Sequence, residues 1–271
     1  MRRAELVALM QRTEGVEITS YLLADPAISR SGGERISRAG GLISWTMRST
    51  DNPFLNRALG FGTMSEATPA ALDRLERRFA AAGRPTRISV AQGATPRATL
   101  RLLERRGYVP EAGTEEHIYC YDRRRLPVVR PVDGLTIERV RAEGAAEYAR
   151  IAFQSFTDRG PEFRHIIEAL VRRRAQGRAL SAFLGRIDGV PAATGMLFDA
   201  RPVAGLGNGS VVPKLRGRGI QNAMIVHRMR AGRERGLRVF FGQTQNPVSA
   251  RNLEELGWRL LYTEVDWVRP P

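Results

Sequence analysis

Residues 211–236 read VVPKLRGRGIQNAMIVHRMRAGRERG, and this stretch decides the fold of the region around it. Two branched apolar residues and a proline lead into an Arg-Gly-Arg-Gly turn, and a helical pattern follows from Ile220 to Arg235. The glycines allow a tight turn that brings successive N–H groups to one side, beside the unpaired amides of a helix N-terminus. Such a turn predicts an anion site, and a pyrophosphate suits it because arginines neutralise the remaining charge.

Two other kinds of phosphate loop do not match this turn. No Gly-Lys-Ser/Thr follows it, and the dinucleotide pattern Gly-x-Gly-x-x-Gly is absent from it. An isolated Arg-Gly-Arg-Gly turn also occurs in disordered RNA-binding tracts. Here a strand and a proline precede the turn, and a long helix and a buried strand, LRVFFGQT, follow it. This context favours an ordered cofactor loop.

Composition excludes several classes of protein. Cys120 is the only cysteine of the 271 residues and the three histidines are scattered, so we expect no disulfide and no metal site. No uncharged apolar run approaches the roughly 18 residues of a membrane span, and Glu5 and Glu14 interrupt the N-terminal pattern before it could resemble a signal peptide. We therefore expect a cytoplasmic protein without a membrane partner, and we allow for a homodimer.

The formal charge of +15 would attract a polyanion. Lys214 is the only lysine, and the arginines are spread along the chain instead of forming one basic stripe. This distribution favours a general surface bias over a nucleic-acid site, although a nucleic-acid-binding module stays as the least favoured alternative.

The segment DRRRLPVVRPVDG, residues 122–134, is charged and punctuated by prolines, as linkers are. We expect domains at 1–125 and 135–271 with a linker at 126–134. In the second half we expect helices from about Ala142 and from Pro161, three strands that include a tight Asp188-Gly189 turn, the long helix, a buried strand, a helix and a final strand.

The first half ends in the same order of helix, strand, helix and strand. Its LLERRGY and the later NLEELGW align at Gly107 and Gly257, with a leucine, a glutamate and an aromatic residue in common. The agreement predicts an internal duplication with a period near 150 residues. The alternative is that amphipathic helices ending in glycine commonly look alike.

The run VVPKLRGRGI with its helix resembles the signature of the GNAT superfamily of acyl-CoA-dependent N-acyltransferases, whose loop reads Arg/Gln-x-x-Gly-x-Gly/Ala. Gln221 stands at the last position, where glycine or alanine is usual. The resemblance covers residues 135 to 271 and implies an α/β (α+β) fold: two tandem GNAT-like domains, each a mixed, mostly antiparallel twisted sheet flanked by helices. The N-terminal half would be a degenerate repeat, because its LGFGTMSEATPAALDRL has no matching arginine turn and its acidic residues would repel phosphate.

The same resemblance implies acetyl-CoA or another acyl-CoA as cofactor. Its pyrophosphate would lie on the loop and its pantetheine arm along the preceding strand. The implied cofactor residues are Val211, Val212, Arg216, Gly217, Arg218, Gly219, Ile220, Gln221, Asn222, Asn246, Ser249 and Asn252. For Asn246, Ser249 and Asn252 the alternative is helix capping, to which an asparagine before Pro247 is well suited.

Acyl transfer to an amine needs a base, an oxyanion donor and, in some enzymes, an acid for the thiolate. A strand amide near Val211 could donate to the oxyanion. Many family members have a tyrosine acid four residues before the glycine of the later helix, and here that residue is Leu253. Ser249 is the nearest hydroxyl that could replace it.

Glu162 and His165 are the candidate bases, although a first-turn charge and a helix-face residue are the commoner roles for such positions. His227 shares a helix face with apolar residues and Cys120 lies in an apparent strand, so we expect both to be packed side chains.

The sequence thus predicts an N-acyltransferase that acetylates an amine of a small molecule or peptide. An acyl-CoA-binding protein without turnover is the alternative, because Leu253 replaces the usual acid and the bases are weak.

Overall fold

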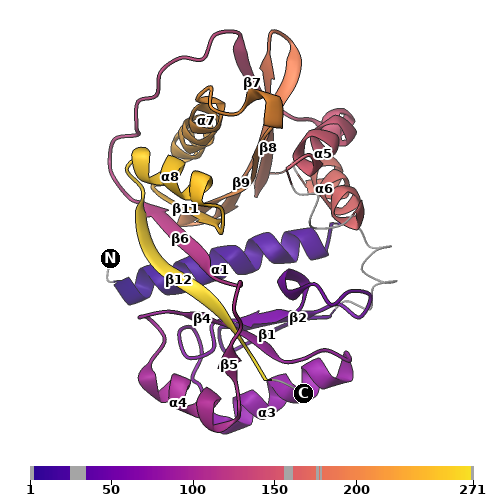
Figure 1. Cartoon of the computed structure of the whole chain (residues 1–271), viewed down its shortest axis with the longest axis vertical. Helices are drawn as coiled ribbons and strands as arrows, with labels where there is room; N and C mark the ends of the chain where they lie inside the picture. Colours follow the sequence, from indigo (N-terminus) through magenta and orange to yellow (C-terminus); the bar gives the residue numbers. More distant parts are fainter. Residues whose placement is uncertain (1–2, 25–34, 156–160, 175–176, 178, 270–271) are drawn as a thin grey trace. The chain divides into compact units, whose positions relative to one another are not determined.

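The computed structural model describes residues 3–24, 35–155, 161–174, 177 and 179–269. By internal contacts the chain divides into two compact units, which are coloured along the sequence in Figure 1. Unit 1 comprises Met1–Leu22, Pro26–Ile118 and Leu260–Pro271, and unit 2 comprises Leu23–Asp25 and Tyr119–Arg259. Each unit is described by itself below.

The expected linker at 126–134 belongs to unit 2 by its contacts. Its apolar side chains pack on the core of that unit: Leu126, Val129 and Val132 all contact the buried cluster. The last strand, by contrast, contributes most of its residues to unit 1. The sequence boundaries of the two domains stay a prediction, because packing divides the chain at other residues.

Unit 2 is a mixed, mostly antiparallel sheet with helices on both faces (Figure 1). Its strand order is β6-β11-β10-β9-β8-β7; β10 pairs with β11 in parallel, while β7, β8, β9 and β10 pair antiparallel. The elements are β6 (Glu116–Tyr121, shared with unit 1), β7 (Leu135–Arg139), η2 (Ala142–Gly144), α5 (Ala145–Phe153), α6 (Pro161–Arg174), β8 (Leu180–Ile187), β9 (Val190–Ala200), β10 (Val203–Val211), η4 (Pro213–Leu215), α7 (Ile220–Glu234), β11 (Val239–Thr244) and α8 (Pro247–Glu255).

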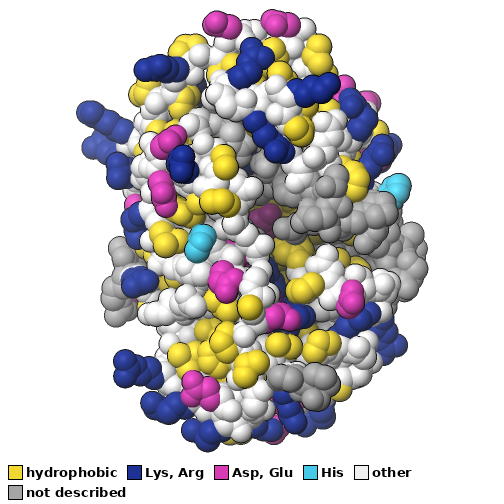
Figure 2. Space-filling model, viewed as in Figure 1, with side chains coloured by type: hydrophobic (Ala, Val, Ile, Leu, Met, Phe, Trp, Pro, Cys, Tyr) yellow, Lys and Arg dark blue, Asp and Glu magenta, His cyan; other side chains and the backbone are white. Residues whose placement is uncertain are grey.

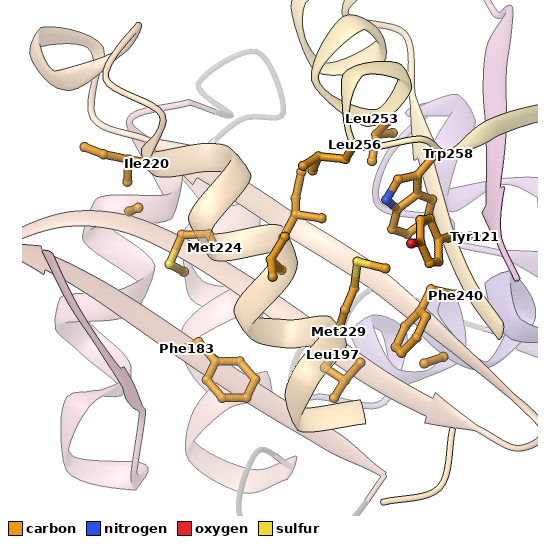
Figure 3. Packing of buried hydrophobic residues seen from close by; sticks show 14 of the residues in the cluster. Tyr121, Phe183, Leu197, Ile220, Met224, Met229, Phe240, Leu253, Leu256 and Trp258 are labelled. Carbon is orange, nitrogen blue, oxygen red and sulfur yellow. The ribbon is translucent and has the colours of Figure 1, made fainter. Parts of the chain in front are cut away.

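The expected helices and strands of this half are confirmed. The helix expected from Ala142 begins with a 3-10 turn, and the α-helix starts at Ala145. Asp188 and Gly189 have φ values of 49° and 80°, as a tight hairpin turn between β8 and β9 requires. One apolar face of α7 packs on the sheet with residues of β6, β8, β9, β11 and α8, and ten of these side chains are labelled in Figure 3.

Unit 1 repeats the order of strands and helices. Its sheet order is β1-β2-β3-β4-β12, in which β3 and β4 pair in parallel and the other pairs are antiparallel. The elements are α1 (Arg3–Leu22), β1 (Arg35–Ala39), β2 (Leu42–Thr46), η1 (Pro53–Leu55), β3 (Arg57–Leu59), α3 (Pro69–Ala81), β4 (Arg87–Ala91), α4 (Arg97–Arg105), β5 (Val109–Pro110) and β12 (Arg259–Val268).

The aligned helix ends of the two halves have the same geometry. Gly107 and Gly257 both have φ of 79°. The amides of Tyr108 and Trp258 donate to Leu103 and Leu253, respectively, at 3.0 Å in each case. Both leucines and both aromatic residues are buried. The match in geometry supports the predicted duplication, although a glycine C-cap of this kind is common.

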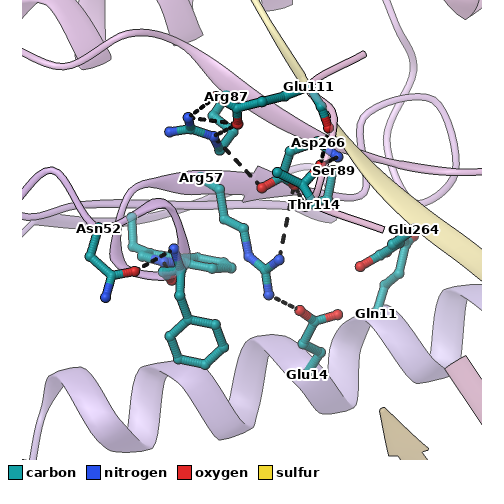
Figure 4. A network of polar contacts seen from close by, with 12 residues as sticks. Gln11, Glu14, Asn52, Arg57, Arg87, Ser89, Glu111, Thr114, Glu264 and Asp266 are labelled. Carbon is teal, nitrogen blue, oxygen red and sulfur yellow. Dashed lines mark hydrogen bonds and ion pairs between the residues drawn. The ribbon is translucent and has the colours of Figure 1, made fainter. Parts of the chain in front are cut away.

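Unit 1 also buries a network of charged side chains (Figure 4). Arg57 pairs with Glu14 and lies 3.9 Å from Asp266, and Gln11 donates to Glu264 at 2.9 Å. These residues lie on α1, β3 and β12. Burial raises the pKa of both Glu14 and Glu264, the latter to about 7. No helix in the described residues is long and apolar enough to cross a membrane.

Candidate functional site

The N-terminus of α7 presents a row of free amides. Gly217 and Gly219 each have φ of 78°, a left-handed conformation that favours glycine. Among the described residues, the amides from Gly217 to Asn222 have no backbone partner, and the helix ladder starts only when Ala223 donates to Gly219. Six consecutive N–H groups at the positive end of a helix dipole are the arrangement that an anion site requires, and anion binding here stays a prediction.

Arginines accompany this loop. Arg216 turns back to the strand, where its Nε donates to the carbonyl of Val211 at 3.2 Å and its terminal amine contacts Ser155 at 3.3 Å. Arg218 is exposed beside the free amides. One arginine therefore fixes the loop to the end of β10, and the other is available to an anion.

Strands β10 and β11 separate along their length. They pair only at three positions, from Val203↔Val239 to Gly205↔Phe241, after which β10 and β11 no longer pair with each other. The amide of Val212 donates to Ala192 of β9, so the alternation of an antiparallel ladder turns the amide of Val211 toward the open side. Val212 has both backbone groups bonded, since its carbonyl also accepts from Leu215. Of the two expected strand contacts, only Val211 offers a free amide.

A β-bulge lies on the open part of β10. The register with β9 shifts between Gly207 and Ser210, and Asn208 has φ of 50°. On one face, the Tyr148 hydroxyl of α5 donates to Asn208 Oδ1 at 2.9 Å. On α7, buried Arg228 donates to the carbonyls of Gly207 and Met196 at 3.1 and 3.2 Å. The bulge is thus held by side chains of two helices.

Gln221, which departs from the family pattern, lies against this bulge. A Cβ placed on Gly209 would be 3.0 Å from Gln221 Nε2. The longer side chain therefore lies against the strand, and the missing side chain of Gly209 leaves the room for it. Crowding of the loop by Gln221 is not a feature of this geometry.

The expected residues on α8 have a mixed outcome. Asn246 caps the helix, since its Oδ1 accepts from the amides of Val248 and Ser249 at 2.9 and 3.1 Å. Ser249 and Asn252 are half-buried and share one face of α8 by their i, i+3 spacing. Leu253 is buried in the core cluster, where its side chain supplies packing. A role of the three polar residues toward a cofactor stays a prediction.

The candidate bases are not brought to the loop by any recorded contact. His165 is exposed on α6, and the side chain of Glu162, in the first turn of that helix, lies outside the described residues. His227 packs edge-on against Phe183 with ring centroids 5.1 Å apart, and burial lowers its pKa. Burial raises the pKa of Cys120 to about 12. The last two are packed side chains, as expected.

In unit 1, amides of the turn that precedes α3 donate to a carbonyl within the same turn. Thr63, Met64 and Ser65 all donate to the carbonyl of Gly60. The first turn of α3 is capped by Thr68, whose hydroxyl accepts from Ala71 at 3.1 Å. This helix start therefore offers an anion fewer free donors than α7 does.

Asn208, Tyr148 and Arg228 were missed by the sequence reasoning. The Asn-Gly pair inside an otherwise apolar strand was a usable signal, because such a pair marks a bulge or a close backbone approach. Arg228 stands at i+8 from Ile220 and i+4 from Met224, so an arginine within the apolar stripe was a second signal. No comparable signal pointed to Tyr148.

Part of the chain that contains this loop matches a known protein family. Residues 121–242 match the model of the acetyltransferase (GNAT) domain. No curated protein matches the sequence. A GCN5-related N-acetyltransferase from Kribbella flavida has a similar structure, with a TM-score of 0.65 and 20% identity over 93% of this chain and 96% of that one.

Two further structures cover nearly the whole chain. A tandem GNAT protein from the clavulanic acid biosynthesis pathway matches with a TM-score of 0.57 and 14% identity, over 94% of this chain and 95% of its own. A conserved protein of unknown function from Bacteroides thetaiotaomicron matches with a TM-score of 0.63 and 10% identity, over 96% and 92%. At these identities the structures support the fold alone. The part of the chain that matches the acetyltransferase (GNAT) domain, residues 121–242, contains the mixed sheet, the parted parallel strands and the glycine turn before α7.

Proposed function

We propose that the protein is an acyl-CoA-dependent N-acyltransferase that binds its acyl donor in unit 2. The row of unpaired amides from Gly217 to Asn222 is the observation that supports this most strongly. A pyrophosphate carries two linked anions, and several N–H donors with an arginine nearby satisfy both. The donor is acetyl-CoA or another acyl-CoA, and the acceptor is an amine of a small molecule or peptide.

The open side of β10 suits the rest of the donor. The pantetheine arm contains amides, and the free N–H of Val211 is a partner for one of them, as an added strand would be. Arg216 already donates to the carbonyl of Val211, so the N–H of Val211 is the backbone group that is more available to the arm. Asn246, Ser249 and Asn252 of α8 remain proposed contacts near the thiol end.

The chemistry requires few groups. A CoA thiolate is a good leaving group, so loss of the tyrosine acid at Leu253 slows the reaction without preventing it. Ser249 is the proposed substitute, and Glu162 and His165 stay the proposed bases. Unit 1 is proposed to be a degenerate copy that does not bind CoA, because the amides of Thr63, Met64 and Ser65 are already bonded to Gly60.

Two measurements test this proposal. Calorimetric titration with CoA should give one site per chain, and acetyl-CoA with a panel of small amines and short peptides should release free thiol in an amine-dependent manner. Absence of CoA binding would refute the proposal. Binding without thiol release across the panel would favour the second candidate, an acyl-CoA-binding protein without turnover, which the buried Leu253 motivates.

The positive charge of the chain does not favour a nucleic-acid partner. On the face shown in Figure 2, Lys and Arg side chains are spread over the surface and interspersed with acidic ones. A dedicated polyanion site would gather them in one stripe.

A further inference from the structure

Arg228 is a charged side chain among the buried residues of α7. It is 2% exposed, and its neighbours on the helix, Met224 and Met229, are buried as well. Its Nε donates to the carbonyl of Met224 at 3.1 Å, and its Nη1 donates to the carbonyls of Met196 and Gly207 at 3.2 and 3.1 Å. Burying a guanidinium costs free energy that an apolar side chain of similar size does not cost. A role beyond packing is therefore worth seeking in the two strands that it joins.

The two strand carbonyls belong to the last pair before the bulge of β10. Met196 and Gly207 lie directly opposite each other, and the next recorded pair is Ser210↔Thr194. Across this gap β10 has one residue more than β9, as a β-bulge has. Because both carbonyls accept from the same nitrogen of Arg228, the arginine joins the two strands at the point where their register changes.

Two glycines leave the room that this side chain fills. A Cβ placed on Gly195, the residue of β9 opposite the bulge, would lie 2.8 Å from both Cζ and Nε of Arg228. A Cβ placed on Gly209, within the bulge, would lie 3.5 Å from Nη2. A side chain at Gly195 would thus displace the guanidinium, and the strands on both sides of the bulge are shaped to admit it.

The bulge decides which way the backbone of β10 faces farther along the strand. If the register of Gly207↔Met196 continued without a shift, Val211 would lie opposite Ala192. In the structure it is Val212 whose amide donates to Ala192, at 2.8 Å. A slip of one residue turns each backbone N–H to the other side of its strand. The extra residue is therefore what leaves the N–H of Val211 for the open side of β10.

We propose that Arg228 is a positioning residue for the acyl donor. Its bonds to Met196 and Gly207 hold the bulge, and the bulge keeps the amide of Val211 turned toward the pantetheine arm. This inference rests on the proposed function, in which that amide donates to the arm. Fixing a register is the best-attested use of a buried polar side chain that costs stability.

The first measurement needs no ligand. Amide hydrogen exchange of the free protein, followed by NMR, compares Val211 with Val212. In the wild type, the bonded amide of Val212 should exchange at least about tenfold more slowly than that of Val211. In Arg228→Met, which keeps an unbranched side chain without its donors, protection should pass from Val212 to Val211 as the register straightens. Arg230→Met, on the exposed part of α7, is the control and should keep the wild-type order.

The second measurement separates the arm of CoA from its nucleotide. Calorimetric titrations use CoA and 3′-phospho-ADP, which carries the pyrophosphate but no pantetheine. Arg228→Met should weaken CoA about five- to tenfold, the effect of one lost hydrogen bond, and should change the Kd of 3′-phospho-ADP less than about twofold. An equal loss of affinity for both ligands would mean general damage to the unit and would overturn the role of Arg228.

A second variant reaches the same site without removing the arginine. Gly195→Ala places a methyl group where the guanidinium lies, so it should reproduce both effects of Arg228→Met. A wild-type order of exchange at Val211 and Val212 in both variants would overturn the proposal. Failure of the wild-type protein to bind CoA would instead overturn the proposed function, and the exchange experiment would still report whether Arg228 sets the register.

Discussion

The turn before α7 in unit 2 and the turn before α3 in unit 1 occupy the same place in the order of elements, but they use their backbone amides in opposite ways. Before α7, the six amides from Gly217 to Asn222 are free. Before α3, the amides of Thr63, Met64 and Ser65 donate to the carbonyl of Gly60, and Thr68 caps the helix. The same topology therefore leaves six consecutive amides free before α7 and bonds three of them before α3.

This difference teaches that the glycine pattern alone does not make the site. Gly60 and Gly62 also have positive φ, at 88° and 82°. Unit 1 differs because the amides of Thr63 to Ser65 are bonded to Gly60 and because no arginine occurs between Gly60 and Pro69. Four substitutions test this difference.

Closing the loop of unit 2 with a negative side chain should have the largest effect. Gly219→Glu forces a glutamate into a left-handed backbone conformation and places a carboxylate beside the free amides. CoA affinity should therefore fall by at least about 100-fold. Gly107→Glu is the matched control, since that glycine has φ of 79° and open space around its Cβ position. Titration calorimetry compares the two variants; equal CoA affinity in Gly219→Glu and Gly107→Glu would contradict the site.

Unit 1 should respond to pH through its buried carboxyls. The pKa of Glu264 is raised to about 7 by burial, with Asp266 and Glu116 adding to the effect of burial and Arg57 opposing it; its neighbour Glu14 is raised as well. A raised carboxyl pKa means that the folded state keeps a proton that the unfolded chain releases, so stability present below pH about 4.5 is lost as pH rises through about 7.

Glu264→Gln keeps the acceptor for Gln11 and removes the titration. It should stabilise the protein by about 2 kcal/mol at pH 8 and flatten the dependence of stability on pH. Urea denaturation at pH 5 and pH 8 measures this, with the exposed Glu255→Gln as the control. An unchanged slope with pH in Glu264→Gln would show that the network does not titrate in this range.

The side chain of the exposed Arg218 should contribute less to CoA affinity than the backbone amides of the loop do. Arg218→Gln should weaken CoA binding about tenfold at low salt, and the difference from wild type should shrink at high salt, because exposed charge pairs are screened. Arg230→Gln, on the exposed part of α7, removes the same charge away from the loop. If both variants lost the same affinity, a general charge effect would replace the local contact.

The smallest effect should follow from removing the cap of unit 1. Thr68→Ala should lower the free energy of unfolding by about 1 kcal/mol and leave CoA affinity unchanged. Asn246→Ala removes the equivalent cap of α8, beside the proposed thiol end. Denaturation and calorimetry on both variants show whether capping is the whole role of Asn246; an affinity loss in Asn246→Ala alone would assign it a cofactor contact.

Sequence patterns predicted most of unit 2 because its elements depend on local signals. The turn at Asp188-Gly189, the Asn246 cap and the glycine turn before α7 are each set by residues next to one another. What could not be predicted were contacts across long separations, such as Tyr148 to Asn208 and Arg57 to Asp266, because they depend on how whole elements pack.

Unit 1 was harder to predict for the same reason. Its first helix, α1, buries Gln11 and Glu14 against partners in later strands, so no clean apolar face marks it in the sequence. The polar face is satisfied only after β3 and β12 are in place. Propensity and periodicity do not contain that information.

Amide hydrogen exchange with and without CoA tests the central claim most directly, because it measures the same kind of group in both turns. CoA should slow exchange at Gly217 to Asn222, whose amides are free, and leave Thr63 to Ser65, which are already bonded, unchanged. Protection at residues 63–65, or none at 217–222 under saturating CoA, would contradict the account.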